Sequence, residues 1–214
     1  MTNPKDPPVK TLLVLNTSLF SGDGQSSRLA ARYVAQWKRE HPEGRVIERD
    51  LAKDPVPHLT AERFQAFLAR PEARTPEQQV VAGQSDALIG ELQAADEIVL
   101  GLPMYNFGIP STLKAYFDHV ARAGITFRYT EKGPVGLLAG KRALVFGTRG
   151  GLYAGTPRDS QTSYVRDFLA FLGIVDVEFV YAEGLSMGDA ARDTALANAH
   201  RAIESLAAPV AVAA

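Results

Sequence analysis

The sequence predicts an α/β protein in which a doubly wound, five-stranded parallel sheet carries helices on both faces. Two observations lead to this fold class. Short runs of strand length alternate along the chain with longer segments of helical spacing. Most of these runs are continuously apolar, which is typical of parallel strands buried on both sides. For 214 residues without an internal repeat we predict one domain over 1–214, with loose tails at 1–9 and 209–214.

The first strand and the first helix have the clearest signals. Residues 11–15 form a continuous apolar run and predict a buried strand. A signal peptide over 10–20 is the weaker interpretation, because Asp6 and two prolines precede the run and no clear small-residue cleavage site follows. Residues 26–37 then predict a helix whose apolar face is made by Leu29, Ala30, Tyr33, Val34 and Trp37.

The next part of the chain is less regular. Residues 45–49 predict a short, more polar strand, which we place near an edge of the sheet. Three prolines within 50–74 indicate irregular structure, with a short helix at 61–68. Thr75-Pro76-Glu77-Gln78 fits a capping box with proline at the first helical position, and it predicts a helix that runs to residue 93.

The second half repeats the alternation with one interruption. The apolar run 97–102 predicts a third strand, and 111–122 predicts the helix that follows it. Alternating polarity with Gly and Pro over 125–138 indicates an excursion or hairpin. The remaining elements are strands at 142–146 and 177–181 and helices at 164–172 and 190–206.

Right-handed crossovers restrict how these strands are arranged. The most economical arrangement is a flavodoxin-like order, 2-1-3-4-5, with the switch point beside the first strand. The loops after strands one, three and four then meet at one edge of the sheet, at 16–25, 103–110 and 148–157. Open sheets of this kind bind their ligands at that edge, so we expect the functional site there.

The loop at 103–110 carries flat and polarizable side chains between two prolines. Met104, Tyr105 and Phe107 offer apolar surface, and Asn106 offers both donors and an acceptor. This composition suits a planar ligand with a polar edge, such as a flavin ring. An ordinary loop whose aromatic side chains fill the core is an equally open interpretation of these residues alone.

The first loop has the character of an anion site. Its hydroxyl residues lead into the helix that begins near Gln25, Ser26 and Ser27, where free backbone N–H groups favour a phosphate monoester. The alternative is that Ser26 or Ser27 serves as an ordinary helix cap. Neither a P-loop Gly-Lys-Ser/Thr nor a Gly-x-Gly-x-x-Gly fingerprint occurs here, which argues against ATP and against NAD held in the usual Rossmann manner.

The third loop contains a glycine pair. Gly150 and Gly151 allow backbone N–H groups to approach the edge of a ring without a Cβ in the way. Thr148 and Arg149 offer further donors. The alternative is a turn that requires glycine. The prediction of a site therefore depends on the joint placement of the three loops.

Composition excludes several classes of function. The formal net charge of −1 provides no basic surface for nucleic acid. The absence of cysteine excludes disulfides, iron–sulfur clusters and thiol nucleophiles, and it favours a cytoplasmic location. The 4 histidines are far apart in sequence, so we expect no metal site. No apolar run is long enough to cross a bilayer, and we expect no membrane association.

With these motifs in view, the chain resembles the FMN-dependent NADH-azoreductases, also called NAD(P)H-quinone reductases, of the flavodoxin-like superfamily. The resemblance spans about 10–206 and is most specific over 103–129. The matching stretches are PMYNF at 103–107, ARAGITFRYT at 121–130, GK at 140–141, TRGG at 148–151 and AEG at 182–184.

The resemblance implies a cytoplasmic homodimer that binds FMN tightly and takes electrons from NADH or NADPH. It implies ping-pong, two-electron hydride transfer to quinones or azo compounds, with no catalytic side chain because the flavin carries the chemistry. The implied FMN-binding residues are Ser18, Gln25, Ser26, Ser27, Met104, Tyr105, Asn106, Phe107, Thr148, Arg149, Gly150 and Gly151. Phe107, Tyr129 and Phe171 are the implied walls of the substrate cleft. Whether Tyr129 and Phe171 act within one chain or from the partner subunit is left open, and plain core packing is the alternative for both.

Two other functions on the same fold are less favoured. A flavodoxin-type electron carrier without its own small-molecule turnover would be expected to be strongly acidic, whereas the net charge here is −1. A phosphorylated receiver domain needs acidic residues after strand one and an Asp at the end of strand three. This chain has Asn16-Thr17 and Pro103-Met104 at those places.

Overall fold

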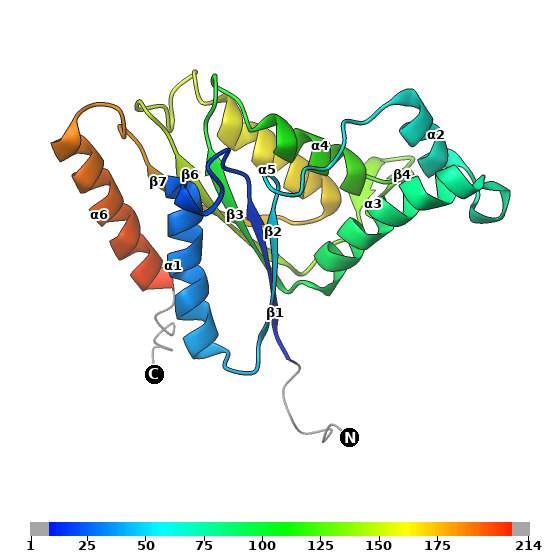
Figure 1. Ribbon diagram of the computed structural model, residues 1–214, viewed down its shortest axis with the longest axis horizontal. Helices are drawn as coiled ribbons and strands as arrows, with labels where there is room; N and C mark the ends of the chain where they lie inside the picture. Colours follow the sequence, from blue (N-terminus) through cyan, green and yellow to red (C-terminus); the bar gives the residue numbers. More distant parts are fainter. Residues whose placement is uncertain (1–8, 207–214) are drawn as a thin grey trace.

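Residues 9–206, which a computed structural model describes, form a central parallel sheet with helices packed on both of its faces (Figure 1). The strands of the sheet are β1 (Thr11–Asn16), β2 (Arg45–Asp50), β3 (Glu97–Pro103), β6 (Arg142–Thr148) and β7 (Asp176–Ala182). The α-helices are α1 (Gln25–Glu40), α2 (Ala61–Leu68), α3 (Pro76–Ala94), α4 (Ser111–Val120), α5 (Ser160–Leu172) and α6 (Asp189–Leu206). Apart from residue 9, the two predicted tails lie outside the described residues.

The five strands lie in the order β2-β1-β3-β6-β7, and each pairs in parallel with its neighbours. The predicted excursion at 125–138 is a separate antiparallel hairpin made by β4 (Phe127–Thr130) and β5 (Gly133–Gly136). Short 3-10 turns at Ser21–Asp23 and Pro71–Ala73 complete the described elements.

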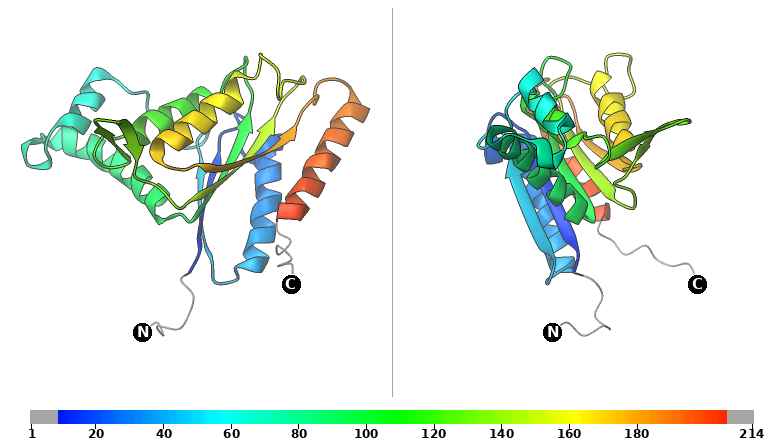
Figure 2. Two further views of the ribbon diagram at one scale, coloured as in Figure 1. Left: turned by 180° about the vertical axis from the view of Figure 1, so that it is seen from behind. Right: turned by 90° about the vertical axis from the view of Figure 1, so that its right-hand side faces the viewer.

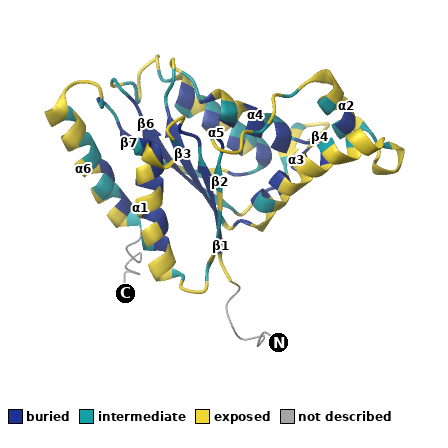
Figure 3. Cartoon of the chain, in the orientation of Figure 1, coloured by how far each residue is buried: buried dark blue, intermediate teal, exposed yellow. Residues whose placement is uncertain are grey.

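Each face of the sheet has its own apolar layer, as the continuously apolar strands require. Leu12 and Val14 of β1 join a cluster with α1 and α6, whereas Leu13 and Leu15 join a larger cluster with α3, α4 and α5. Figure 2 shows the two helical layers from behind and from the side. Figure 3 shows that buried positions are concentrated in the strands and on the sides of the helices that face them.

Helix α5 begins at Ser160, four residues before the predicted start at 164. The cause is Asp159, whose carboxylate accepts a hydrogen bond from the Thr162 N–H at 3.0 Å and caps the helix. Apolar periodicity begins only near Tyr164, so the first turn of the helix is polar and was missed. This polar turn lies against the candidate site.

The hairpin β4–β5 packs closely on the carboxyl end of α5. A Cβ at Gly136 would lie 2.0 Å from the Gly173 nitrogen and 2.2 Å from the Leu172 carbonyl carbon, so only glycine fits. The Leu138 N–H donates to the Leu172 carbonyl at 2.8 Å and continues the contact. The hairpin is therefore attached at the carboxyl end of α5, opposite to the end that lies against the candidate site.

Replacement of Gly136 should separate the hairpin from α5. We expect Gly136→Ala to lower the free energy of unfolding by about 1–3 kcal/mol, because the clash is with backbone atoms that have no alternative rotamer. Urea unfolding monitored by circular dichroism measures the change. Gly90→Ala in α3 is the matched control, because its Cβ meets nothing within 4 Å and alanine is the better helix former by about 1 kcal/mol. Equal stability of Gly136→Ala and the wild type would contradict the packing described here.

Candidate functional site

A cavity of about 460 Å³ opens at the carboxyl ends of β3 and β6, the edge at which the sequence places the site. Its volume is in the range of small-molecule and cofactor pockets. The lining residues are Met104, Asn106, Phe107, Gly150, Gly151, Tyr153 and Ser186. Five of the seven were predicted as ligand-binding residues from the sequence, whereas Tyr153 and Ser186 were not.

The loop after β3 makes a tight turn at the mouth of this cavity. The N–H groups of Tyr105 and Gly108 each donate to the other's carbonyl, at 3.1 and 3.0 Å. Asn106 and Phe107 between them have φ values of +49° and +67°, so the turn has the character of a type I′ turn. Phenylalanine rarely adopts such a backbone. The strained turn presents the Phe107 ring, which is 51 % exposed, at the cavity.

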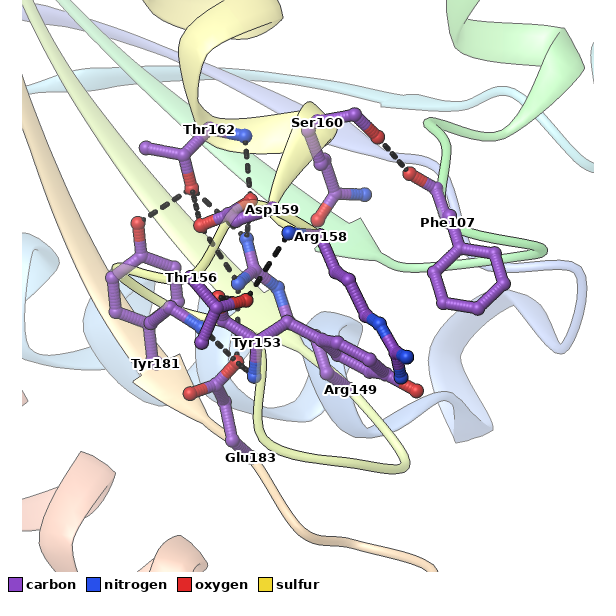
Figure 4. Close-up of polar contacts among 12 residues, drawn as sticks. Phe107, Arg149, Tyr153, Thr156, Arg158, Asp159, Ser160, Thr162, Tyr181 and Glu183 are labelled. Atoms are coloured by element: carbon purple, nitrogen blue, oxygen red, sulfur yellow. Dashed lines mark hydrogen bonds and ion pairs between the residues drawn. The ribbon is translucent and has the colours of Figure 1, made fainter.

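The first residues of α5 hold this turn in place. The Ser160 hydroxyl donates to the Phe107 carbonyl, as Figure 4 shows. The buried Gln161 amide donates to the carbonyls of Pro103 at 3.0 Å and Gly108 at 3.2 Å. Side chains from a helix 50 residues further along the chain thus fix the conformation of the β3 loop.

The Arg149 side chain points away from the cavity, contrary to the expectation that it offers donors to a ligand. Its guanidinium is fully buried and lies between Asp159 and Glu183 (Figure 4). Both terminal nitrogens bond the Asp159 carboxylate, at 2.9 and 3.0 Å, and one of them also bonds Glu183 at 3.1 Å. The Arg149 N–H donates to the Ala182 carbonyl, so its backbone donor is also occupied.

The electrostatics of this cluster follow from its pairing. Burial raises the pKa of Asp159, but the hydrogen bonds from Arg149 and Thr162 outweigh it and hold the pKa below its ordinary value. Burial raises the pKa of the Tyr181 hydroxyl, against a hydrogen bond with Thr162 and the nearby Arg149 charge. The carboxylate therefore stays ionised and paired, and Tyr181 stays neutral with its ring 4.7 Å from the guanidinium carbon.

Two backbone N–H groups beside the cavity have no hydrogen-bond partner within residues 9–206. The carbonyls of Arg149 and Gly150 accept from Leu185 and Ser186 at 3.1 and 3.0 Å. In a trans peptide the following N–H points opposite to the carbonyl, so the N–H groups of Gly150 and Gly151 face away from the segment after β7. Neither N–H donates a hydrogen bond to any residue within 9–206. They are donors available to a ligand, as the sequence suggested for this glycine pair.

Tyr153 completes the wall beside the glycines. A Cβ at Gly151 would lie 2.9–3.1 Å from its ring and hydroxyl, so the ring covers Gly151. The ring also meets Phe107 edge to face at 5.6 Å, which joins the second and third loops across the mouth. Nothing in the sequence distinguishes this tyrosine, because its position depends on the fold of the loop. Ser186 likewise reaches the site only through the segment after β7.

The start of α1 offers a second polar region. The hydroxyl oxygens of Ser26 and Ser27 are buried without a hydrogen-bond partner, and no side chain caps the helix. The first N–H groups of any helix, here from Gln25 onward, also have no acceptor within the helix. Unpaired buried polar groups are costly in isolation, and their convergence at a helix start is suited to an anion.

Tyr105 connects this polar region to the cavity. Its hydroxyl lies 3.5 Å from the Ser18 hydroxyl and accepts from the Leu19 N–H at 3.2 Å. The predicted phosphate residues Ser18, Gln25, Ser26 and Ser27 do not line the cavity itself; they surround the neighbouring start of α1. Gly24 is required here, since its Cβ would lie 2.1 Å from the Ser18 oxygen.

Thr148, the last residue of β6, is buried, and its carbonyl accepts from the Met104 N–H at 2.9 Å. It therefore joins the ends of β6 and β3 beneath the cavity and does not line it.

Two predicted cleft residues lie apart from the cavity within one chain. Tyr129 is on the hairpin and 73 % exposed. Phe171 packs on Phe127 at 4.2 Å near the carboxyl end of α5. The start of α5 touches the cavity loops, and the 13-residue helix is about 20 Å long. Phe107, Tyr129 and Phe171 thus do not form one cleft within a single chain.

Two further features bear on the site and its surroundings. Within residues 9–206, no cluster of three or more His, Cys, Asp or Glu side chains is arranged to hold a metal ion. No helix in that part of the chain is long and apolar enough to cross a membrane.

An open parallel sheet with unpaired polar groups at the start of its first helix and a cavity beside it is typical of the flavodoxin-like fold. Residues 10–207 match a protein family described by its flavodoxin-like fold, and the chain belongs to this family.

Relatives with assigned activities are similar over nearly the whole chain. A protein of Cellvibrio japonicus named FMN-dependent NADH:quinone oxidoreductase is 56 % identical over 91 % of this chain and 96 % of its own length. A protein of Alcanivorax borkumensis with the same name is 56 % identical over 87 % of this chain and 94 % of its own length. The solved FMN-dependent NADH-azoreductase of Bacillus anthracis in complex with FMN has a TM-score of 0.85 and 29 % identity. That comparison covers 93 % of this chain and 98 % of the solved one.

The strained turn can be tested by two substitutions at one position. Phe107→Gly and Phe107→Ala both remove the ring, but only glycine relieves the left-handed backbone. We expect the glycine variant to be more stable by about 1 kcal/mol, as measured by urea unfolding. The order is opposite to that expected at the helical control position 90, where alanine is favoured. Equal stability of the two Phe107 variants would show that residue 107 is not held in the left-handed region.

Proposed function

We propose that this protein is an FMN-dependent NAD(P)H oxidoreductase that reduces quinones and azo compounds by ping-pong, two-electron hydride transfer. The observation that carries the proposal is that the unpartnered Ser26 and Ser27 hydroxyls at the start of α1 lie near a cavity bordered by the unpaired N–H groups of Gly150 and Gly151. The names of the close relatives support the same activity.

The residues present fit FMN in a specific orientation. We assign the phosphate to the start of α1, where Ser18, Gln25, Ser26 and Ser27 supply hydroxyl and backbone donors. The β3 loop, from Met104 to Phe107, lies between that position and the cavity, and it is suited to the ribityl chain and one side of the ring. Thr148 and Arg149 support the ring from below through the backbone of their loop.

When bound, FMN supplies the hydride chemistry between the nicotinamide and the acceptor. The chain contributes binding and electrostatics. The N–H groups of Gly150 and Gly151 would hold the carbonyl edge of the ring and would favour negative charge there. These N–H groups are already oriented in the absence of a ligand, because the preceding carbonyls are hydrogen bonded to Leu185 and Ser186. No side chain of the cavity is needed as a proton donor, since solvent reaches the open face.

The cleft is completed in a homodimer. The hairpin exposes three large apolar residues, Tyr129, Val135 and Leu137, and exposed apolar side chains of this kind are typical of an interface. Because Tyr129 cannot reach the cavity of its own chain, its place in the acceptor pocket requires a second copy. We place this single-domain enzyme in the cytoplasm, where its nicotinamide donors are available.

One set of measurements tests both the identity of the cofactor and the enzymatic turnover. The purified protein is expected to be yellow, to release FMN and not FAD on denaturation, and to oxidise NADH rapidly with a small naphthoquinone or an azo dye as acceptor. Mass spectrometry identifies the released cofactor, and steady-state kinetics with both acceptors give the turnover. Bound FMN without such turnover would instead indicate an electron carrier. Absence of FMN from protein refolded with excess FMN would refute the proposal.

Substitution of Tyr129 tests whether two subunits share the acceptor cleft. We expect Tyr129→Ala to change the KM or kcat for the acceptor more than the rate of reduction by NADH, with FMN still bound, because the ring forms an outer wall. Tyr129→Phe, which keeps the ring, is the control and should resemble the wild type. Light scattering gives the oligomeric state. A fully active monomer would refute the shared cleft, and a dimer with unchanged acceptor kinetics would return Tyr129 to a packing role.

A further inference from the structure

Arg149 occupies an unusual position for a residue next to a ligand-binding glycine pair. Its side chain is fully buried, yet it carries a permanent charge. The two terminal nitrogens make four hydrogen bonds, to both Asp159 oxygens, to Glu183 and to the Thr162 hydroxyl, at 2.9–3.1 Å. A buried charge of this kind is tolerated only when its partners are fixed in place. The guanidinium therefore imposes one geometry on the segments that supply those partners.

The first of those segments is the loop that carries the cavity donors. The Glu183 carboxylate, which also pairs with Arg149, accepts hydrogen bonds from the N–H groups of Tyr153 at 2.8 Å and Ala154 at 2.9 Å. One carboxylate thus ties the loop after the glycine pair to the end of β7. The path of the loop from Gly150 to Ala154 depends on the charge that holds Glu183.

The second segment is the start of α5. Asp159 both pairs with Arg149 and caps the helix whose next two residues, Ser160 and Gln161, hold the strained turn at Phe107. The contact chain therefore runs from Arg149 through Asp159 and the first turn of α5 to the β3 loop. One buried cation is common to the two loops that flank the cavity.

We propose that Arg149 is a positioning residue that sets the two ring-flanking loops in register, with Asp159 as the joint between them. The inference rests on the proposed function, because its consequence is measured on FMN. Arg149 does not touch the ring; it acts through the Gly150–Gly151 donors on one side and the Phe107 turn on the other. Its loss leaves Asp159 and Glu183 as two largely buried carboxylates with no cation between them, so both loops are released from their common partner.

The test separates positioning from folding. Arg149→Lys keeps the charge but cannot bond two carboxylates in the same fork. We expect the FMN dissociation constant of the apo-protein to rise by about tenfold or more, from the loss of paired buried groups. Titration of FMN fluorescence gives the affinity, and circular dichroism checks the fold.

The chain provides a matched control on the same pair of strands. Arg142 at the start of β6 pairs with Glu178 of β7 at 2.8 Å, at the end of the strands away from the cavity. Arg142→Lys should leave the FMN dissociation constant unchanged. Asp159→Asn is the second variant: asparagine retains the cap but removes the charge, and we expect it to weaken FMN binding in the same direction.

Unchanged FMN affinity in a folded Arg149→Lys protein would overturn the inference, as would an equal loss in Arg142→Lys. Should Arg149→Lys fail to fold, Asp159→Asn decides, and wild-type affinity in that variant overturns the inference. Failure of the wild-type protein to bind FMN would overturn the proposed function together with this inference. If the wild-type protein binds FMN tightly and the Arg149→Lys and Asp159→Asn variants bind it equally well, only the inference about Arg149 is overturned.

Discussion

The burial of the Arg149 guanidinium is the constraint on which the geometry of this site depends. A desolvated cation is stable only with its charge and donors satisfied, and here the partners come from the end of β7 and the start of α5. Meeting that requirement brings three elements together at the edge of the sheet. The apolar layers on the two faces provide stability, but they do not determine how the loops at this edge lie. The positions of these loops are determined by polar contacts that lie a few residues beyond the ends of the strands.

At this edge the chain breaks two local rules. Phe107 adopts a left-handed backbone, and two serine hydroxyls at the start of α1 are buried without partners. Each is unfavourable in isolation. All lie on the side of the sheet where the loops after β1, β3 and β6 end, while the opposite end has ordinary pairs such as Arg142 with Glu178. Unfavourable features of this kind are expected at an edge where binding of a ligand compensates for the strain.

The strands and the site edge could be predicted from the sequence because their signals are local. The apolar run at 97–102 and the capping box at Thr75 report on neighbouring residues, and the convergence of the loops follows from handedness alone. The direction of the Arg149 side chain could not be predicted, because its partners are 10 and 34 residues away. The position of Tyr153 was missed for the same reason. The first turn of α5 was missed because its residues are polar, although Asp159 is of a residue type that commonly caps a helix.

The distribution of polar groups also bears on selectivity. Within the described chain, the cavity has backbone donors at the glycine pair and polar side chains at Asn106 and Ser186, and further polar groups lie at the start of α1. The surfaces that would face a second ring are the aromatic side chains of Phe107 and Tyr153, which meet edge to face at 5.6 Å. Under the proposed function, the cofactor is held by directional hydrogen bonds and the acceptor by apolar contact. Hydrogen-bonding sites discriminate strongly between ligands, whereas apolar pockets discriminate weakly. A site arranged in this way selects one flavin and accepts many flat acceptors, including quinones and azo compounds that share little beyond planarity.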